Sequence, residues 1–284
     1  FIERPARHPK LSNKAALILG VLAIAGFILA SNIIKNESKA DWRVNYTLDE
    51  SVIRGHPLNK VCLIEGGAYD TENCIIGENK DGYEAIVAGD SQAWNYRAAL
   101  TKWAKDNGIT LRLFMRSACP AWVIQSEVRI RNGKPDTSCQ TLAQDFHKTI
   151  KENDHIKYVF IGNLMASGTD DERASLEALA KSGKTIIFLG QTPLYKSDPH
   201  QCLIKDNLMI SRWFPRKNKC AALTHTYSND KIRKAQETLL PILEDNDIAF
   251  FDPLPLMPDP KDEQGRFMFK DRSHINVYGA LHLE

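Results

Sequence analysis

The chain has 284 residues, of which 43% are of apolar type, and its formal net charge is +2. This length supports one substantial core with a smaller appendage, but not two large domains. Nucleic-acid-binding proteins usually carry a strong basic excess on one element, whereas here 37 basic residues nearly balance 35 acidic ones. We therefore expect no nucleic-acid partner.

Residues 15–34, with the sequence AALILGVLAIAGFILASNII, carry no charge. A helix of this length, rising about 1.5 Å per residue, spans roughly 30 Å, the thickness of a bilayer's hydrocarbon core. A signal peptide would have a shorter apolar region, and a buried core helix would show a polar solvent face. We predict a transmembrane helix at 15–34. A polar, basic lead-in at 1–14 precedes it, and the basic residues on its two sides weakly favour a cytoplasmic N-terminus.

The six cysteines all lie after this apolar segment, in three couples that are close in sequence. None of them forms the C-x2-C pair that is typical of zinc sites, so we expect no metal. An even number of cysteines on one side of a membrane indicates disulfides, and therefore an oxidising compartment. Local closure favours the pairs 62–74, 119–139 and 202–220, and scattered thiols are the alternative. The residues are Cys62, Cys74, Cys119, Cys139, Cys202 and Cys220.

Residues 35–80 are charged and lack periodic apolar stretches, so we interpret them as a linking region that packs in part on the next domain. We predict a globular domain at 81–284. Its apolar runs alternate with amphipathic stretches, which indicates a parallel sheet with helices on both faces, an α/β/α sandwich. The expected strands are 83–90, 110–115, 155–162, 185–190 and 248–253, and the expected helices are 92–106, 138–152, 170–182, 229–245 and one beginning near 276.

Reactive side chains follow the first and the last predicted strand. Gly-Asp-Ser at 89–91 ends the first, and Asp271 and His274 follow the last. In open α/β sheets, sites lie beyond the carboxyl ends of the strands. A serine nucleophile needs a base, and the base needs a carboxylate to orient it. Either motif alone is also explained by an ordinary helix cap or a surface histidine. Together they predict Ser91 as nucleophile, His274 as base and Asp271 as the orienting acid.

These two motifs resemble the first and last conserved blocks of SGNH (GDSL-like) hydrolases. CPAW at 119–122, QTPLYKSDPHQC at 191–202 and DRSHINVYGALHL at 271–283 narrow the resemblance to SGNH domains fused to acyltransferase family 3 membrane proteins. The opening FIERPAR is similar to the cytoplasmic exit of that family's last core membrane helix. The specific resemblance is to bacterial enzymes that O-acetylate lipopolysaccharide O-antigen sugars.

The resemblance implies a flavodoxin-like SGNH-hydrolase sandwich and the same three catalytic roles. The family's oxyanion hole combines the N–H of the nucleophile, a glycine N–H after the second strand and an asparagine after the third. Here no glycine follows the second strand, and the usual spacer and following Asp are missing after the third. The candidate oxyanion donors are Asn163 and Ser117, and the candidate substrate-binding residues are Arg116 and Trp122.

The resemblance also implies that the chain is the C-terminal portion of an enzyme of the bacterial inner membrane, with its catalytic domain in the periplasm. The acyltransferase family 3 domain would supply the acyl group, ultimately from acetyl-CoA, and this chain would bind no cofactor itself. The expected function is the final step of O-acetylation of a cell-surface polysaccharide through a Ser-His-Asp acyl-enzyme. The alternatives are a periplasmic carbohydrate esterase or deacetylase, and a non-catalytic polysaccharide-binding module.

Overall fold

The computed structural model describes residues 22, 24, 26, 62, 74–77, 82–131, 133–196, 199, 225–264 and 266–284. Leu22, Ile24 and Gly26 are helical and belong to one unit, and the other described residues belong to a second. The rest of the predicted transmembrane helix at 15–34, and most of the linking region, lie outside the described residues. Among the residues described, no helix is long and apolar enough to cross a membrane.

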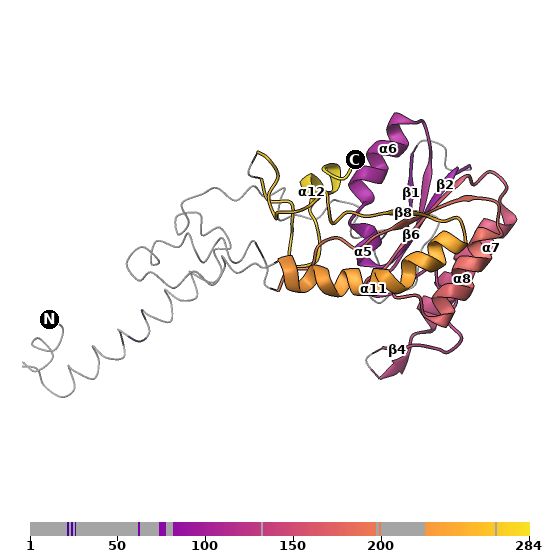
Figure 1. Cartoon of the computed structure of the whole chain (residues 1–284), viewed down its shortest axis with the longest axis horizontal. Helices are drawn as coiled ribbons and strands as arrows, with labels where there is room; N and C mark the ends of the chain where they lie inside the picture. The colour runs from indigo at the N-terminus through magenta and orange to yellow at the C-terminus, as the bar shows by residue number, and fades with distance from the viewer. Residues whose placement is uncertain are drawn as a thin grey trace, which may run out of the picture. The chain divides into compact units, whose positions relative to one another are not determined.

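A six-stranded sheet forms the centre of the described domain, in the order β1-β3-β2-β6-β7-β8 (Figure 1). Strands β2, β3, β6, β7 and β8 run parallel to one another, as predicted. The edge strand β1 pairs antiparallel with β3 and was not predicted. The strands are β1 (Ile75–Ile76), β2 (Ala85–Gly89), β3 (Leu111–Met115), β6 (Tyr158–Gly162), β7 (Thr185–Leu189) and β8 (Ala249–Phe251).

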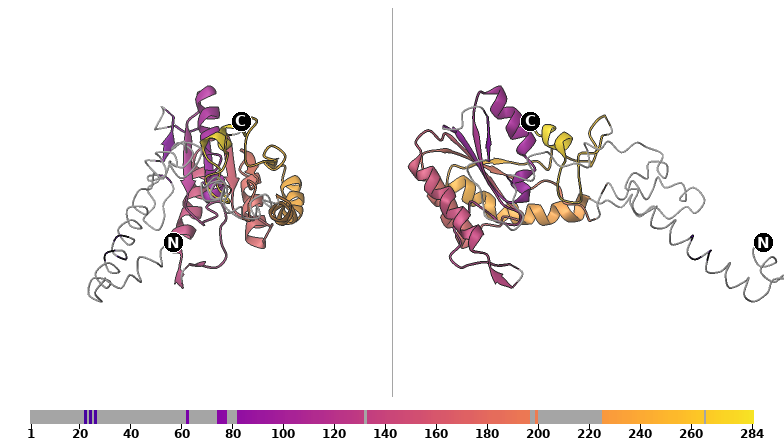
Figure 2. Two further views of the ribbon diagram at one scale, coloured as in Figure 1. Left: turned by 90° about the vertical axis from the view of Figure 1, so that its left-hand side faces the viewer. Right: turned by 180° about the vertical axis from the view of Figure 1, so that it is seen from behind.

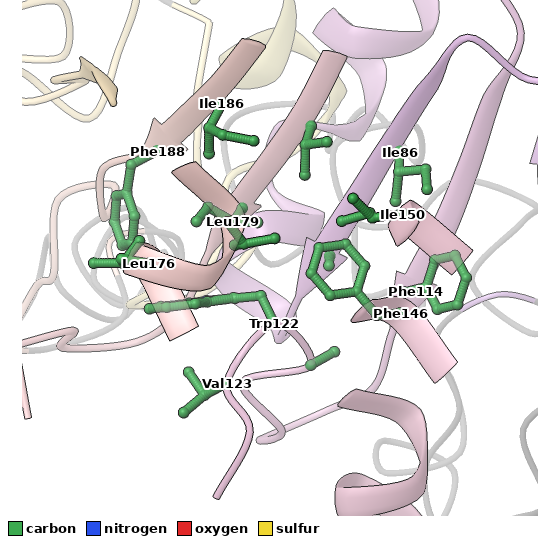
Figure 3. Close-up of a cluster of buried hydrophobic side chains, with 14 of the residues drawn as sticks. Ile86, Phe114, Trp122, Val123, Phe146, Ile150, Leu176, Leu179, Ile186 and Phe188 are labelled. Carbon is green, nitrogen blue, oxygen red and sulfur yellow. The ribbon is translucent and has the colours of Figure 1, made fainter. Parts of the chain in front are cut away.

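Helices cover both faces of the sheet, and each face has its own apolar core (Figure 2). The central strand β2 is buried throughout, which explains its continuous apolar sequence. Helices α7, α8 and α11 pack on one face, where Phe146, Leu176 and Leu239 join a single core cluster (Figure 3). Helices α5, α6 and α12 pack on the other face. Their bounds are α5 (Ser91–Trp94), α6 (Arg97–Asp106), α7 (Thr137–Glu152), α8 (Asp170–Ala180), α11 (His225–Asp245) and α12 (Val277–Leu281).

The single helix predicted at 92–106 is in fact two helices, α5 and α6, separated at Asn95 and Tyr96. Both of these side chains are buried and bind groups beyond β7. The Tyr96 hydroxyl donates to the carbonyl oxygen of Gly190, and the Asn95 amide donates to Thr192 Oγ1 at 2.8 Å. The break therefore directs two polar side chains toward the strand ends, where the predicted site lies.

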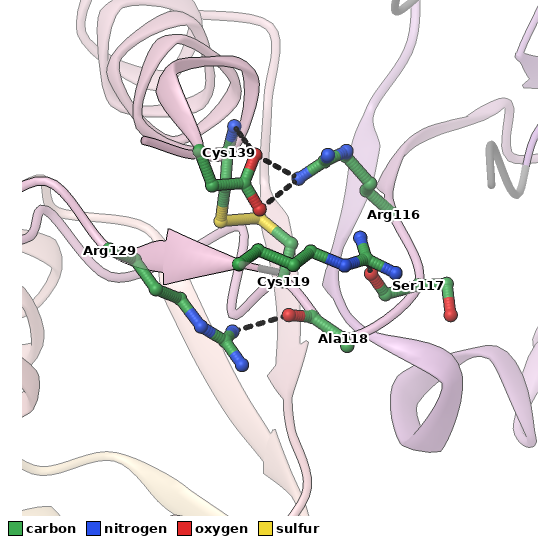
Figure 4. The surroundings of a disulfide bond; sticks show 8 residues. Arg116, Ser117, Ala118, Cys119, Arg129 and Cys139 are labelled. Carbon is green, nitrogen blue, oxygen red and sulfur yellow. Dashed lines mark hydrogen bonds and ion pairs between the residues drawn. A yellow bond between two sulfur atoms is a disulfide. The ribbon is translucent and has the colours of Figure 1, made fainter. Parts of the chain in front are cut away.

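The predicted disulfide between Cys119 and Cys139 is present, and it joins the turn after β3 to the first turn of α7 (Figure 4). The chain between these cysteines forms a two-stranded hairpin that the sequence analysis did not predict. Its strands are β4 (Ile130–Arg131) and β5 (Lys134–Pro135).

The other two predicted disulfides involve different parts of the chain. Cys62 and Cys74 are both buried in the core cluster on the α5–α6 face, and the bridge between them stays a prediction. Cys202 and Cys220 lie outside the described residues.

Candidate active site

The turn between β2 and α5 places Ser91 at the carboxyl edge of the sheet, as predicted. Gly89, the last residue of β2, lies opposite Gly162 of β6. A Cβ atom on Gly89 would lie 1.9 Å from the carbonyl oxygen of Gly162 and 2.7 Å from the Ala93 Cβ. Only glycine fits there, and the chain can then turn at once into α5, whose first residue is the half-buried Ser91.

Asp90 connects this turn to the segment that follows β6. Its carboxylate caps α5 by accepting the Gln92 N–H at 2.8 Å, and it also accepts the Leu164 N–H at 3.0 Å. Burial raises the pKa of the Asp90 carboxyl, although these hydrogen bonds and the nearby His274 oppose the rise. Asp90 therefore holds together two of the loops at the strand ends.

Asp271 and His274 form the pair that the sequence predicts. His274 Nδ1 lies 2.8 Å from Asp271 Oδ2, and the backbone N–H groups of Ser273 and His274 donate to Asp271 Oδ1 at 2.8 and 2.9 Å. Burial raises the pKa of Asp271, but the hydrogen bonds from His274 and Ser273 outweigh it, and the pKa lies well below its usual range. The ionised carboxylate fixes the proton on Nδ1, which leaves Nε2 able to accept another.

The contact between the base and the serine is open in this structure. His274 Nε2 is buried and has no hydrogen-bond partner among the described residues. Ser91 and His274 thus form no hydrogen bond in this structure. Such contacts are often long in unliganded enzymes and shorten when the substrate binds.

A buried polar network ties the loop that carries His274 to the helix that carries Ser91. The Ser273 carbonyl oxygen accepts hydrogen bonds from Gln92 Nε2 at 3.1 Å and Asn95 Nδ2 at 3.3 Å, and the Thr192 hydroxyl lies 3.5 Å away. Gln92, Asn95 and Thr192 are at most 5% exposed. This network could not be predicted from the sequence, because none of its members has a local sequence signature.

The turn at residues 116–119 stands where the family pattern has a glycine, and one of its residues has a backbone conformation that favours glycine. Ala118 adopts a φ of 53°, the left-handed conformation that favours glycine. Arg131 donates to the Ser117 carbonyl at 3.1 Å and Arg129 donates to the Ala118 carbonyl (Figure 4). Because C=O and N–H point in opposite directions across a trans peptide, the Ser117–Arg131 bond turns the Ala118 N–H away from the hairpin. The Ala118 N–H is therefore a further candidate backbone donor, and the Ser117 N–H stays a prediction.

The expectation that Arg116 faces a substrate is wrong. Its side chain is buried, and Nη1 lies 2.8 Å from the carboxylate of Asp136. Burial raises the pKa of Asp136, but the hydrogen bond and charge of Arg116 outweigh it and lower that pKa overall. A buried guanidinium requires such a partner, so Arg116 anchors the start of α7.

The expectation that Trp122 stacks on a sugar is also wrong. Its indole ring is fully buried and packs edge-to-face on Phe188, with ring centroids 5.7 Å apart. Three residues of this segment belong to the apolar core on the face that α7 and α8 cover, namely Cys119, Ala121 and Trp122. Figure 3 shows Trp122 in this core. Trp122 instead orients a site residue, since its N–H donates to Asn163 Oδ1 at 3.1 Å.

The hydrogen bond from Trp122 identifies the oxygen and the nitrogen of the Asn163 amide, because an indole N–H can only donate and must face the oxygen. Asn163 Nδ2 then has two long contacts, 3.4 Å to the Leu164 carbonyl and 3.5 Å to Glu172 Oε1. The amide is oriented but its donors are weakly engaged. Among the described side chains, no group of three or more His, Cys, Asp or Glu is placed to hold a metal ion.

The family model described as "SGNH domain (fused to AT3 domains)" matches residues 61–284. The chain belongs to this family. No curated protein matches the sequence of this SGNH domain significantly. A solved structure, the periplasmic domain of a lipopolysaccharide acetyltransferase of Salmonella ser. Paratyphi A, has 18% identity and a TM-score of 0.51, covering 72% of this chain and 81% of that chain. A candidate SGNH hydrolase from Slackia heliotrinireducens has 12% identity and a TM-score of 0.42, with coverages of 72% and 95%.

At this level of identity the Salmonella structure supports the fold alone. The family match and this likeness confirm the resemblance read from the GDS and D-x-x-H motifs. They agree with the mostly parallel α/β sheet of the SGNH domain and leave the roles of its individual residues to be argued from the site.

Replacing Asn95 with leucine should lower the free energy of unfolding by about 1–3 kcal/mol, because buried partners in the Ser273 network lose a donor. Urea denaturation measures this. The control is Gln144→Leu on the exposed face of α7, which should change stability little. Equal effects of the two substitutions would contradict a stabilising network.

The two site carboxyls should titrate on opposite sides of the ordinary aspartate pKa of about 3.9. Carbon-13 NMR of the carboxyl groups should give Asp271 the lower midpoint, because hydrogen bonds favour its charged form, and Asp90 the higher, because burial disfavours it. Asp271 then stabilises the fold above its unfolded-state pKa, and this contribution is lost as pH falls through the folded-state pKa. The reverse order would contradict the site described here.

Proposed function

We propose that this chain performs the final step of O-acetylation of a cell-surface polysaccharide, the lipopolysaccharide O-antigen, through an acyl group carried on Ser91. The main observation behind this proposal is the Asp271–His274 pair. The carbonyl of Ser273, between them in the chain, accepts a hydrogen bond from the helix that begins at Ser91. Membership in a family of SGNH domains fused to AT3 domains supports it, as does the likeness to a lipopolysaccharide acetyltransferase domain.

In the first half-reaction, Ser91 Oγ attacks the acyl carbonyl while His274 Nε2 takes the hydroxyl proton. Asp271 stabilises the imidazolium that results. The tetrahedral intermediate then collapses, the bond to the leaving group breaks, and His274 returns the proton to that group. The acyl group is left as an ester on Ser91.

In the second half-reaction, a sugar hydroxyl gives its proton to His274 Nε2 and attacks the ester. Collapse of the second intermediate breaks the bond to Ser91, and His274 reprotonates the serine oxygen. The product is an O-acyl sugar, and the site returns to its starting state.

Each intermediate places a negative charge on the former carbonyl oxygen. The proposed donors to it are the N–H groups of Ser91 and Ala118 and the amide of Asn163. A donor of this kind lowers the barrier by roughly 3 kcal/mol. Asn163 would exchange its long contact to Glu172 for the oxyanion.

The acyl donor is proposed to reach the site through a membrane acyltransferase domain, with acetyl-CoA as ultimate source. A predicted transmembrane helix at 15–34 would anchor the chain in the bacterial inner membrane, with the SGNH domain in the periplasm. The Cys119–Cys139 disulfide fits such an oxidising compartment. This chain is then expected to bind no cofactor.

Water can compete with the sugar at this site. The side chains of Asp271 and His274 are 39% and 33% exposed, so solvent reaches the outer side of the pair, although His274 Nε2 itself is buried. We expect the chain alone to hydrolyse small activated esters slowly through Ser91. An esterase differs only in the acceptor, so acceptor analysis separates the two functions.

NMR analysis of the O-polysaccharide in cells tests the proposed function. Joining the chain to an acyltransferase family 3 domain should produce acetylated sugar, and Ser91→Ala or His274→Ala should abolish it because nucleophile or base is removed. Ser117→Ala, which keeps the backbone N–H, is the matched control. Acetylation that survives Ser91→Ala, or that the chain alone achieves with acetyl-CoA, would contradict the proposal.

A further inference from the structure

A small cavity lies beside the candidate site, between the segments that follow β6 and β7 and one face of α11. It encloses about 240 Å³ including its open mouth, and only about one water-sized group moves freely within it. Its walls are mostly apolar, with Phe188, Ile232, Leu239 and Phe250 among them. The cavity itself therefore has room for one small group, such as a methyl or a carbonyl oxygen, and the rest of a ligand would extend through its open mouth.

Two glutamines bring amide nitrogens to this cavity. Gln191 Oε1 accepts the Met165 N–H at 2.9 Å, which sets the orientation of the amide and leaves Nε2 as its other end. Nε2 of Gln191 and Nε2 of Gln236 are both buried and have no partner among the described residues. The two residues are only 6% and 8% exposed. Buried polar groups are almost always paired in native proteins, so these donors indicate a missing acceptor.

The cavity is adjacent to the proposed nucleophile. Gly89 of β2 and Gly162 of β6 are partners in the sheet, so Asn163, which lines the cavity, follows β6 next to the turn that carries Ser91. A group held in the cavity would lie one strand away from the start of α5.

The lining selects the chemistry of the ligand. No charged residue is among the described residues that line the cavity, so a buried carboxylate would have no counter-ion. The amide donors suit a neutral carbonyl oxygen, and the apolar walls suit a methyl group. We propose that this cavity binds the carbonyl and methyl of a short acyl group.

Two sources of such a group are compatible with this chemistry, and naming them depends on the proposed function. One is the acyl group delivered to Ser91. The other is an N-acetyl substituent on the acceptor sugar. For the N-acetyl substituent, Gln191 and Gln236 donate to the carbonyl and the apolar walls contact the methyl. For the acyl group on Ser91, whose carbonyl oxygen is assigned to the oxyanion donors, the apolar walls contact the methyl.

The test uses the full chain in detergent and one probe for each source. Saturation-transfer NMR reports whether the methyl of N-acetylglucosamine contacts the protein. The rates of hydrolysis of p-nitrophenyl acetate and butyrate report the room available to an acyl group carried to Ser91. Thermal melting of every variant confirms that it is folded.

Three substitutions on α11 probe the cavity. Gln236→Met removes a donor at nearly constant shape, and Ala235→Leu fills space, so each should weaken N-acetylglucosamine binding about tenfold if the substituent binds here. Ile232→Val adds room for one methyl group and should raise the butyrate-to-acetate rate ratio severalfold if the acyl group on Ser91 binds here. Glu237→Gln, exposed on the same helix, is the matched control and should change neither readout.

A response to either probe supports the acyl site and identifies its source. If neither readout changes in a folded variant, the cavity holds only a water molecule and the inference is overturned. The unmodified chain could show no Ser91-dependent hydrolysis while the methyl of N-acetylglucosamine still gives a signal that Gln236→Met weakens. That result would contradict the proposed function but support the acyl site.

Discussion

The carbonyl oxygen of Ser273 is the contact on which the geometry of this site depends. It receives hydrogen bonds from Gln92 and Asn95, which lie in and just after α5, and it stands next to His274 in the chain. The proposed nucleophile and base are more than 180 residues apart in sequence. This carbonyl links the two segments through donors that are buried and also bonded to one another.

The site departs from the family pattern mainly at the turn after β3, where the second oxyanion donor is proposed. A glycine would adopt the left-handed conformation without strain, whereas Ala118 adopts it while arginines of the hairpin hold the carbonyls of Ser117 and Ala118. The buried Arg116–Asp136 pair and the Cys119–Cys139 disulfide fix both ends of the same segment. Side chains and a cross-link thus hold the turn from which Ala118 is proposed to donate to the oxyanion.

Much of the fold could be predicted from the sequence, because buried parallel strands such as β2 read as unbroken apolar runs. The strand β1 and the β4–β5 hairpin could not, since pairs of residues carry no periodic signal. The break between α5 and α6 was missed because the apolar spacing continues through it. What interrupts the helix is the pairing of Asn95 and Tyr96 with groups beyond β7.

The candidate site was predictable only where residue type and chain position coincide. Ser91, Asp271 and His274 follow strands and carry chemistry that few other arrangements explain. Arg116 and Trp122 have equally suggestive side chains, but both are buried, and burial depends on tertiary packing that no local pattern encodes. Ala118 and the Ser273 network were missed for the opposite reason, since nothing in their residue types suggests a role.

The central claim is that Ser91 carries the acyl group, and trapping that intermediate tests it most directly. The full chain is exposed to p-nitrophenyl acetate, quenched in acid and mapped by peptide mass spectrometry. The account predicts one acetyl group on the peptide containing Ser91, and none there in the Ser91→Ala variant. Ester turnover with the acetyl group on another residue, or turnover undiminished in that variant, would contradict it.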